Sequence, residues 1–187
     1  MRLRKLFSRK RREKVIILDR DGTIVVDRNY LSDPADLEFE AGAAEGLRLM
    51  YERGYRLVVI TNQSGVGRGL FSVERLEEIH DRLRQMAESI GIRFEGVYYC
   101  PHAPDAGCLC RKPQIGLFNQ AASELGFDRS SAVVIGDKMS DVEFGQRAGA
   151  RTVFVAANSP RSPAGPTPDF IVRDLVQAAQ VIQYATD

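Results

Sequence analysis

Two aspartates separated by one residue follow an apolar run near the beginning of the chain, in the order Asp19-Arg20-Asp21-Gly22-Thr23. The apolar run, residues 15–18, predicts a buried strand. Because an unpaired buried carboxylate is costly, two of them at a strand end indicate either a bound cation or a chemical task. The first can attack phosphorus as a nucleophile, and the second can deliver and remove protons. The alternative is an ordinary strand end with a turn-forming Asp-Gly pair.

Polar residues also follow three later apolar runs. Thr61-Asn62-Gln63-Ser64 comes after residues 56–60, Cys100 after residues 97–99, and Asp137 after residues 132–135. In an open parallel sheet, the carboxyl ends of the strands line the crevice where ligands bind. We therefore expect these side chains to converge with the two aspartates in one functional site.

The residue types at this edge suit phosphoryl transfer, which depends chiefly on positioning and on neutralising the charge of the oxygens. Asp19 and Asp137 can hold a divalent cation, and Mg²⁺ is the natural choice because it prefers oxygen ligands. Thr61 and Asn62 can donate hydrogen bonds to phosphate oxygens. Lys112 can supply a positive charge that, with the cation, lets an anionic nucleophile approach an anionic phosphate.

All three cysteines lie in one short segment, together with one of the two histidines. The four potential ligands are Cys100, His102, Cys108 and Cys110. Three thiolates and an imidazole are typical of a closed tetrahedral zinc site, which is structural because no position is left open. The alternative, a disulfide with one free thiol, is disfavoured in a reducing cytoplasm. Zinc would order the loop and set Arg111 and Lys112 at the edge of the site.

The rest of the chain alternates short apolar runs with amphipathic segments. Strands are predicted at residues 15–18, 56–60, 97–99, 132–135 and 152–155, with an edge strand at 170–172. Helices are predicted at residues 43–53, 72–90, 115–125, 141–148 and 175–184, and a loop at 158–168. Continuous apolar strands are typical of a parallel sheet covered on both faces. The expected fold is therefore α/β, a Rossmann-like open parallel sheet with helices on both faces.

Four of these segments, taken in order, resemble the motifs of the haloacid dehalogenase (HAD) superfamily of phosphatases. They are Asp19-Arg20-Asp21-Gly22-Thr23, Thr61-Asn62, Lys112 and Gly136-Asp137-Lys138-Met139-Ser140-Asp141. The resemblance covers roughly residues 15–157, and it implies one phosphatase domain over residues 15–187. No gap between the motifs is long enough for a large cap domain, so we expect an open site or one covered only by loops.

The resemblance also implies roles for individual residues. Asp19 would be the nucleophile that becomes an aspartyl phosphate, and Asp21 the general acid/base. Asp19, the backbone carbonyl of Asp21 and the side chain of Asp137 would bind Mg²⁺. Thr61 and Lys112 would stabilise the transferred phosphate. The acid at the end of the fourth motif would support these groups.

The cysteine loop resembles that of a narrower group, the D-glycero-D-manno-heptose-1,7-bisphosphate 7-phosphatases and the related histidinol-phosphate phosphatases. Residues 61–69, 98–102 and 136–138 look like the heptose enzymes. The five residues between His102 and Cys108 form a short insert, which is similar to the histidinol phosphatases and leaves both substrates open.

Around the substrate, the resemblance implies a set of rim and phosphate-contacting residues. They are Asp27, Tyr30, Thr61, Asn62, Gln63, Ser64, Arg111, Lys112 and Lys138. Cations outnumber acids at this rim, which favours a phosphorylated sugar with a second phosphate over histidinol phosphate.

The charge distribution separates a tail from the body. Residues 1–14 hold eight of the 26 Lys and Arg and one of the 25 Asp and Glu, which leaves a net charge of −6 elsewhere. The basic tail is expected to be disordered and solvated, although it could contact an acidic membrane surface or nucleic acid. The acidic body argues against nucleic-acid binding. Without a secretory signal or a transmembrane segment, we expect a cytoplasmic protein, and a monomer.

Two other classes of protein could carry these motifs. In a signalling receiver, a phosphorylated aspartate is a switch, but a base such as Asp21 beside it would promote its hydrolysis. In a zinc-bearing binding module without catalysis, the full set of acidic and basic groups would have no task. Both alternatives are separated from an enzyme by repeated turnover of a phosphate ester with Mg²⁺.

Overall fold

The computed structural model describes residues 14–156 and 165–183 of the chain. The strands are β1 Val15–Leu18, β2 Arg56–Asn62, β3 Phe94–Cys100, β4 Ala132–Gly136, β5 Arg151–Val155 and β6 Phe170–Val172. The α-helices are α1 Ala43–Glu52, α2 Ser64–Gly67, α3 Val73–Ser89, α4 Gly116–Leu125, α5 Met139–Ala148 and α6 Leu175–Gln183. Short 3₁₀ helices lie at Pro34–Asp36 and Arg129–Ser131. The predicted basic tail, except Lys14, and most of the loop predicted at 158–168 lie outside the described residues.

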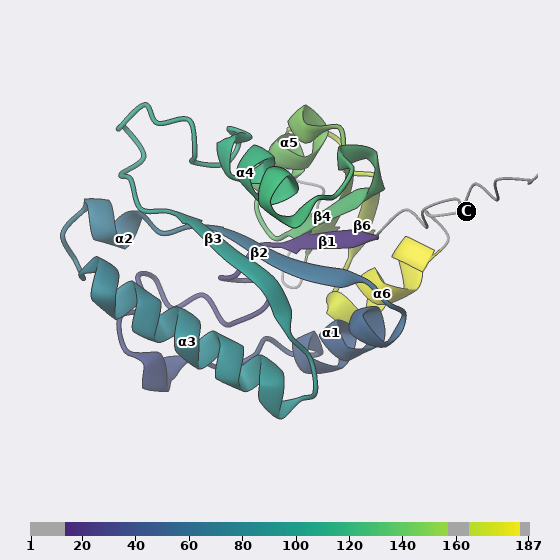
Figure 1. The fold of residues 1–187 in the computed structure, drawn as a ribbon, viewed down its shortest axis with the longest axis horizontal. Helices are drawn as coiled ribbons and strands as arrows, with labels where there is room; N and C mark the ends of the chain where they lie inside the picture. Colours follow the sequence, from purple (N-terminus) through teal and green to yellow (C-terminus); the bar gives the residue numbers. More distant parts are fainter. Residues whose placement is uncertain (1–13, 157–164, 184–187) are drawn as a thin grey trace, which may run out of the picture.

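The six strands form one parallel sheet in the order β3-β2-β1-β4-β5-β6 (Figure 1). β1 lies in the middle, where Leu18 is in register with Val59 of β2 and Ile135 of β4. The segments that follow these three strands therefore emerge side by side at one edge. This is the topological position at which open α/β sheets bind ligands.

Helices cover both faces of the sheet, as the sequence predicts. Figure 1 shows α1, α3 and α6 on one face and α4 and α5 on the other. The alternation along β1 supplies both cores: Ile16 and Leu18 pack in the first, and Val15 and Ile17 in the second. All four are buried, which accounts for the continuous apolar run in the sequence.

Several element boundaries differ from those predicted. β3 begins at Phe94 rather than at residue 97, because Glu95 and Gly96 interrupt the apolar pattern without interrupting the strand. α5 begins at Met139 rather than at residue 141, because the Asp141 carboxylate accepts from the Lys138 backbone N–H, 3.0 Å away, and caps the helix. The glycine-containing segment directly after β2 forms the short helix α2.

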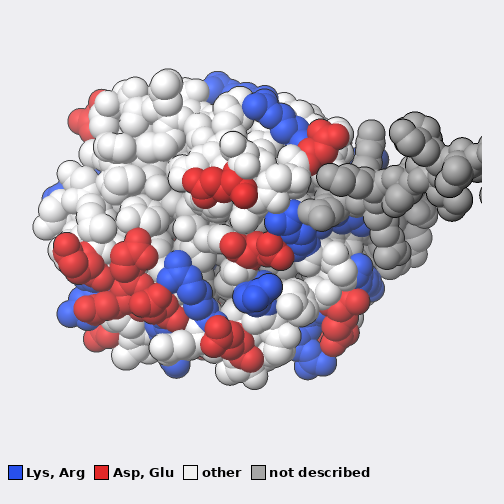
Figure 2. Space-filling model, in the orientation of Figure 1, with Lys and Arg blue, Asp and Glu red and all other residues white. Residues whose placement is uncertain are grey.

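Within the described residues, no large cap domain is inserted between the motifs. The segment between β1 and α1 is a loop with one 3₁₀ helix and two isolated bridges, Asp21 with Val25 and Val25 with Phe39. None of the described helices combines the length and apolar character required to cross a bilayer. On the face seen in Figure 2, acidic and basic side chains are mixed, and the described residues form no broad basic surface there.

Candidate active site

A pocket of about 280 Å³ lies at the carboxyl ends of β1 and β2. It is lined by eleven of the residues singled out from the sequence: Asp19, Asp21, Asp27, Tyr30, Thr61, Asn62, Gln63, Ser64, Arg111, Lys112 and Lys138. The first of these residues in the chain, Asp19, and the last, Lys138, are more than a hundred positions apart. The structure thus brings together nearly all of the predicted site.

The centre of the site is a buried lysine that forms ion pairs with two buried carboxylates. The Lys112 ammonium lies 2.8 Å from Asp19 Oδ1 and 2.7 Å from Asp141 Oδ1, and it also donates to the Ile60 carbonyl at 2.8 Å. Burial opposes the charged form of Lys112, but the charges of Asp141 and Asp19 prevail and raise its pKa. Lys112 is therefore a permanent cation beside the proposed nucleophile.

The fourth motif meets the first across β1 and β4. The Thr23 hydroxyl donates to Asp137 Oδ1 at 3.2 Å, which ties the turn after β1 to the end of β4. Gly22 has a φ of +83°, and a side chain there would collide with the Asp137 carboxylate. Only glycine allows this close approach.

Three carboxylates gather where a metal ion would be expected. One ligand oxygen from each of Asp19, Asp137 and Asp141 lies within 4.8 Å of the others. Burial raises the pKa of Asp137 to about 7, the Asp19 charge adds to this rise, and Lys138 opposes it. Carboxylate oxygens are the ligands that Mg²⁺ prefers, so the donor set fits Mg²⁺.

The side chain of Asn62 has a different partner from the one expected. Its Oδ1 accepts from the Lys112 backbone N–H at 3.0 Å, and its Nδ2 donates to the Lys112 carbonyl at 3.2 Å. Both ends of the amide are thus used to fix the residue that carries the site cation. Asn62 lines the pocket, but its side-chain amide already has two partners in this arrangement.

The carboxylate of Asp21 belongs to a second group of contacts. Arg20 Nε lies 3.1 Å from each of its oxygens, and Gln63 Nε2 lies 2.7 Å from Oδ2. Gln63 Nε2 also lies 2.8 Å from Thr61 Oγ1. Gln63, predicted to contact phosphate, lines the pocket, and its side chain connects Thr61 to the proposed acid/base.

The rim of the pocket carries charged and aromatic side chains from three loops. Lys138 Nζ lies 3.1 Å from Asp27 Oδ2. Tyr30 is 46% exposed, and the Arg68 guanidinium lies over its ring, 5.7 Å from the centroid. Arg111 Nη1 is buried and has no hydrogen-bond partner among the described residues. A ligand with an acceptor oxygen would satisfy this donor.

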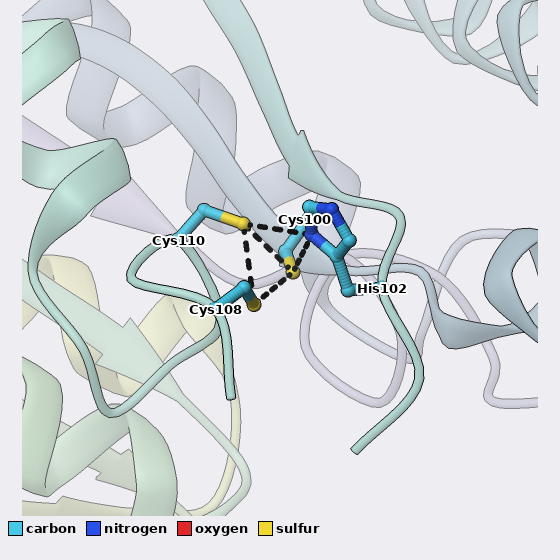
Figure 3. Close-up of side chains that lie close together, drawn as sticks. All are labelled: Cys100, His102, Cys108 and Cys110. Carbon is cyan, nitrogen blue, oxygen red and sulfur yellow. Dashed lines mark hydrogen bonds between the residues drawn. The ribbon is translucent and has the colours of Figure 1, made fainter. Parts of the chain in front are cut away.

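The cysteine loop closes into a compact cluster (Figure 3). The Cys110 sulfur lies 3.1 Å from that of Cys100 and 3.5 Å from that of Cys108, and the Cys108 and Cys100 sulfurs are 3.6 Å apart. His102 Nδ1 lies 3.2 Å from the Cys110 sulfur. These separations exceed the ~2 Å of a disulfide and approach the ~3.8 Å edge of a zinc-thiolate tetrahedron. The set fits zinc, and all three cysteines are free.

The zinc-type loop touches both sides of the pocket. The Gly67 N–H at the end of α2 donates to the Pro101 carbonyl at 2.8 Å, and the Gly116 N–H of α4 donates to the Leu109 carbonyl at 3.1 Å. Lys112 follows two residues after the last cysteine. The loop therefore connects the elements that place the site cation.

His80 on α3 is completely buried. Its ring lies 5.2 Å from that of Tyr99. Burial, with a contribution from Arg20 and Arg84, lowers its pKa to about 3. The imidazole is therefore neutral at physiological pH and does not repel the buried Arg20 guanidinium.

This burial has a measurable effect on stability in acid. As the pH falls below the ordinary His pKa of 6.5, His80 becomes protonated in the unfolded chain. In the folded protein, its pKa of about 3 keeps it neutral over this range. Stability is therefore lost over that interval. Between pH 7 and pH 5, urea unfolding should show the wild type losing about 2 kcal/mol more than a His80→Leu variant. Equal losses would show that His80 binds protons in the folded state.

Arg20 and Ser140 also line the pocket, and the sequence motifs alone indicate a role for neither. The position of Arg20 between two site aspartates is the one sequence feature that could have indicated its place in the site. A lone arginine after a strand gives no indication of its burial, and Arg20 is only 1% exposed. Asp141, expected to support the site, contacts Lys112 directly.

The sheet order, with Asp19 and Asp21 after its central strand and Lys112 beside the first of them, defines an HAD-type hydrolase. The HAD-hydrolase-like family model matches residues 109–178. A D,D-heptose 1,7-bisphosphate phosphatase from B. bronchiseptica, solved with magnesium and phosphate, superposes with a TM-score of 0.84 and 28% identity. The match covers 92% of this chain and 99% of that one.

Two curated relatives show which family within the HAD superfamily this chain is similar to. A D-glycero-beta-D-manno-heptose-1,7-bisphosphate 7-phosphatase of Haemophilus ducreyi is 36% identical over 147 residues, which are 75% of this chain and 81% of that protein. One of Helicobacter pylori (strain J99) is 38% identical over 148 residues, 79% and 85% of the two chains. The chain belongs to this family of heptose-bisphosphate 7-phosphatases within the HAD superfamily, and it is a phosphoric monoester hydrolase. The resemblance noted from the four motifs is confirmed.

Proposed function

We propose that this chain is a Mg²⁺-dependent phosphatase that removes the 7-phosphate of D-glycero-D-manno-heptose 1,7-bisphosphate. The observation that carries the chemistry is the buried contact between the Asp19 carboxylate and the Lys112 ammonium inside the pocket. The choice of sugar is supported by the substrate in the names of its relatives.

In the first step, Asp19 attacks the phosphorus of the 7-phosphate and forms an aspartyl phosphate. The bond from phosphorus to the sugar oxygen breaks, and Asp21 gives that oxygen a proton. Lys112 and the Thr61 hydroxyl stabilise the charge on the transferred oxygens.

In the second step, water attacks the phosphorus of the aspartyl phosphate. Asp21 accepts a proton from this water, and the bond between Asp19 and phosphorus breaks. Inorganic phosphate leaves, and both aspartates return to their starting forms.

Two metals complete the proposal. Mg²⁺ would be held by Asp19, Asp137 and the backbone carbonyl of Asp21, and it would neutralise charge on the phosphoryl oxygens. Zn²⁺ would be held by the cluster of Cys100, His102, Cys108 and Cys110 as a structural ion. The carboxylate and thiolate donor sets described above support each assignment.

The distal phosphate of a bisphosphate would find cations at the rim. Arg111 offers a buried donor without a partner among the described residues, and Lys138, paired with Asp27, also lines the pocket. Histidinol phosphate presents an amine and an imidazole, which would prefer acids there. The short insert in the cysteine loop is the one feature that favours histidinol phosphate, so both substrates belong in the test.

We expect the heptose bisphosphate to have a higher kcat/KM than histidinol phosphate. Arg111→Ala should lower kcat/KM for the bisphosphate about 10- to 100-fold, because a charge-assisted contact to its distal phosphate is lost. An aryl monoester should lose less than about threefold, because remote contacts assist only substrates that reach them. Steady-state kinetics with the three substrates measures both differences.

Arg93→Ala is the matched control, because Arg93 is exposed at the amino end of β3, far from the pocket. Equal losses on bisphosphate and monoester would mean that Arg111 serves the reacting phosphate. A preference for histidinol phosphate would replace the proposed sugar. A protein that became phosphorylated without turning over would instead be a signalling receiver. A protein that showed neither phosphorylation nor turnover would be a binding module.

The remaining parts of the proposal concern the protein's location, its oligomeric state and its domain boundaries. We propose a cytoplasmic monomer in which residues 15–187 form the phosphatase domain and residues 1–14 are a solvated basic tail. The substrate is a small molecule, and no nucleic-acid partner is proposed. Size-exclusion chromatography with light scattering at several concentrations tests the monomer.

A further inference from the structure

The buried Arg20 lies in the sequence between Asp19 and Asp21, the two aspartates of the proposed mechanism, but that mechanism does not use it. Its side chain is only 1% exposed and is among the largest fully buried side chains of the described residues. Burying a guanidinium costs free energy unless strong contacts compensate it. Those contacts go almost entirely to one group, the carboxylate of Asp21.

Three hydrogen bonds join the guanidinium to this carboxylate. Arg20 Nε lies 3.1 Å from both oxygens of Asp21, and Nη2 lies 3.0 Å from Oδ1. Gln63 Nε2 adds a third donor atom and a fourth hydrogen bond, 2.7 Å from Oδ2. Both carboxylate oxygens therefore face donors, an arrangement that fixes the orientation of the carboxylate plane.

Gln63 closes this set into a ring. Its Oε1 accepts from Arg20 Nη2 at 2.9 Å, so the amide cannot rotate without losing contacts to both Arg20 and Asp21. Its Nε2 also lies 2.8 Å from Thr61 Oγ1. Because the Thr61 oxygen accepts from Gln63, the hydroxyl hydrogen remains available for a phosphoryl oxygen.

We infer that Arg20 and Gln63 are positioning residues that hold the Asp21 carboxyl group in a fixed orientation, from which it takes the proton of the attacking water. The inference rests on the proposed function, because it assigns a role within the second step. The O–H bond of the water breaks, its proton goes to Asp21, and the oxygen bonds to phosphorus as the Asp19–phosphorus bond breaks. Arg20 and Gln63 exchange no proton with the substrate.

The inference separates the two half-reactions. An aryl phosphate with a good leaving group needs little proton donation, so formation of the phosphoenzyme should depend weakly on Asp21. Hydrolysis of the phosphoenzyme should depend on it strongly, since general-base catalysis and good alignment are each worth about 10²-fold or more. A residue that only stabilised the fold would affect both half-reactions alike.

The test is Arg20→Met, with formation and decay of acid-trapped phosphoenzyme measured from a labelled aryl phosphate in single turnovers. We expect decay to slow at least about tenfold and formation to change less than about threefold. Arg20→Lys should recover only part of the loss, because an ammonium cannot reproduce the forked contact. Arg56→Met is the matched control: Arg56 pairs with Glu95 at the opposite end of β2 and should leave both rates unchanged.

Should Arg20→Met fail to fold, Gln63→Leu keeps the inference falsifiable, because it removes one donor to Asp21 and no charge. It should also slow decay more than formation. Equal slowing of both steps, or unchanged decay in a folded variant, would overturn the inference while leaving the phosphatase intact. A wild type that forms no phosphoenzyme would instead overturn the proposed function itself.

Discussion

Replacing Asp19 by Asn is expected to lower turnover by about three orders of magnitude or more, with the fold retained. An amide is a poor nucleophile toward phosphorus and a weaker ligand for Mg²⁺ than a carboxylate. The fold should survive because Lys112 keeps its contacts with Asp141 and the Ile60 carbonyl. Steady-state turnover of the sugar phosphate, with thermal unfolding in parallel, measures both parts.

Two further variants place this result in context. Asp21→Asn should also be severely slowed, since it removes the proposed proton acceptor. Asp128→Asn is the matched control, because Asp128 is exposed before the 3₁₀ helix Arg129–Ser131 and distant from the pocket lining. If Asp19→Asn kept more than about a tenth of the wild-type activity, the covalent mechanism would be wrong.

Replacing Cys108 by Ser is expected to abolish zinc binding, loosen the loop and reduce phosphate binding. The wild type should hold one zinc per chain. A structural zinc contributes directly to the folding of its loop, so the variant should lose several kcal/mol of local stability. Lys112 follows this loop directly, and its backbone is fixed by Asn62. Elemental analysis, thermal unfolding and the Kd for inorganic phosphate measure the three effects.

Ala106→Ser is the matched control, because it changes an exposed residue of the same loop that is not one of the four ligands. It should retain the zinc and the wild-type affinity for phosphate. Protein purified without chelator that contained no zinc and carried a mapped disulfide would refute the zinc assignment. Zinc retained in Cys108→Ser with an unchanged Kd would refute the role of Cys108.

Much of the fold and of the central chemistry could be predicted from the sequence, because both depend on local patterns. The apolar runs at residues 15–18, 57–60, 132–135 and 152–155 are buried strands, and polar residues that follow such a run lie at the strand's carboxyl end. This reasoning placed Asp19, Thr61 and Asp137 without any tertiary information. The spacing of the four zinc-type ligands was equally local, since all lie within one loop.

Only the tertiary structure decided what the side chains at these positions contact. Asn62 and Gln63 were expected at the phosphate, but the structure pairs Asn62 with the Lys112 backbone and Gln63 with Arg20 and Asp21. A side-chain amide can pair with any suitable donor or acceptor, and these partners lie more than 40 residues away. The burial of Arg20 and His80 could not be predicted from the sequence either. Charge and periodicity describe a residue's own segment, whereas burial depends on what the rest of the chain packs against it.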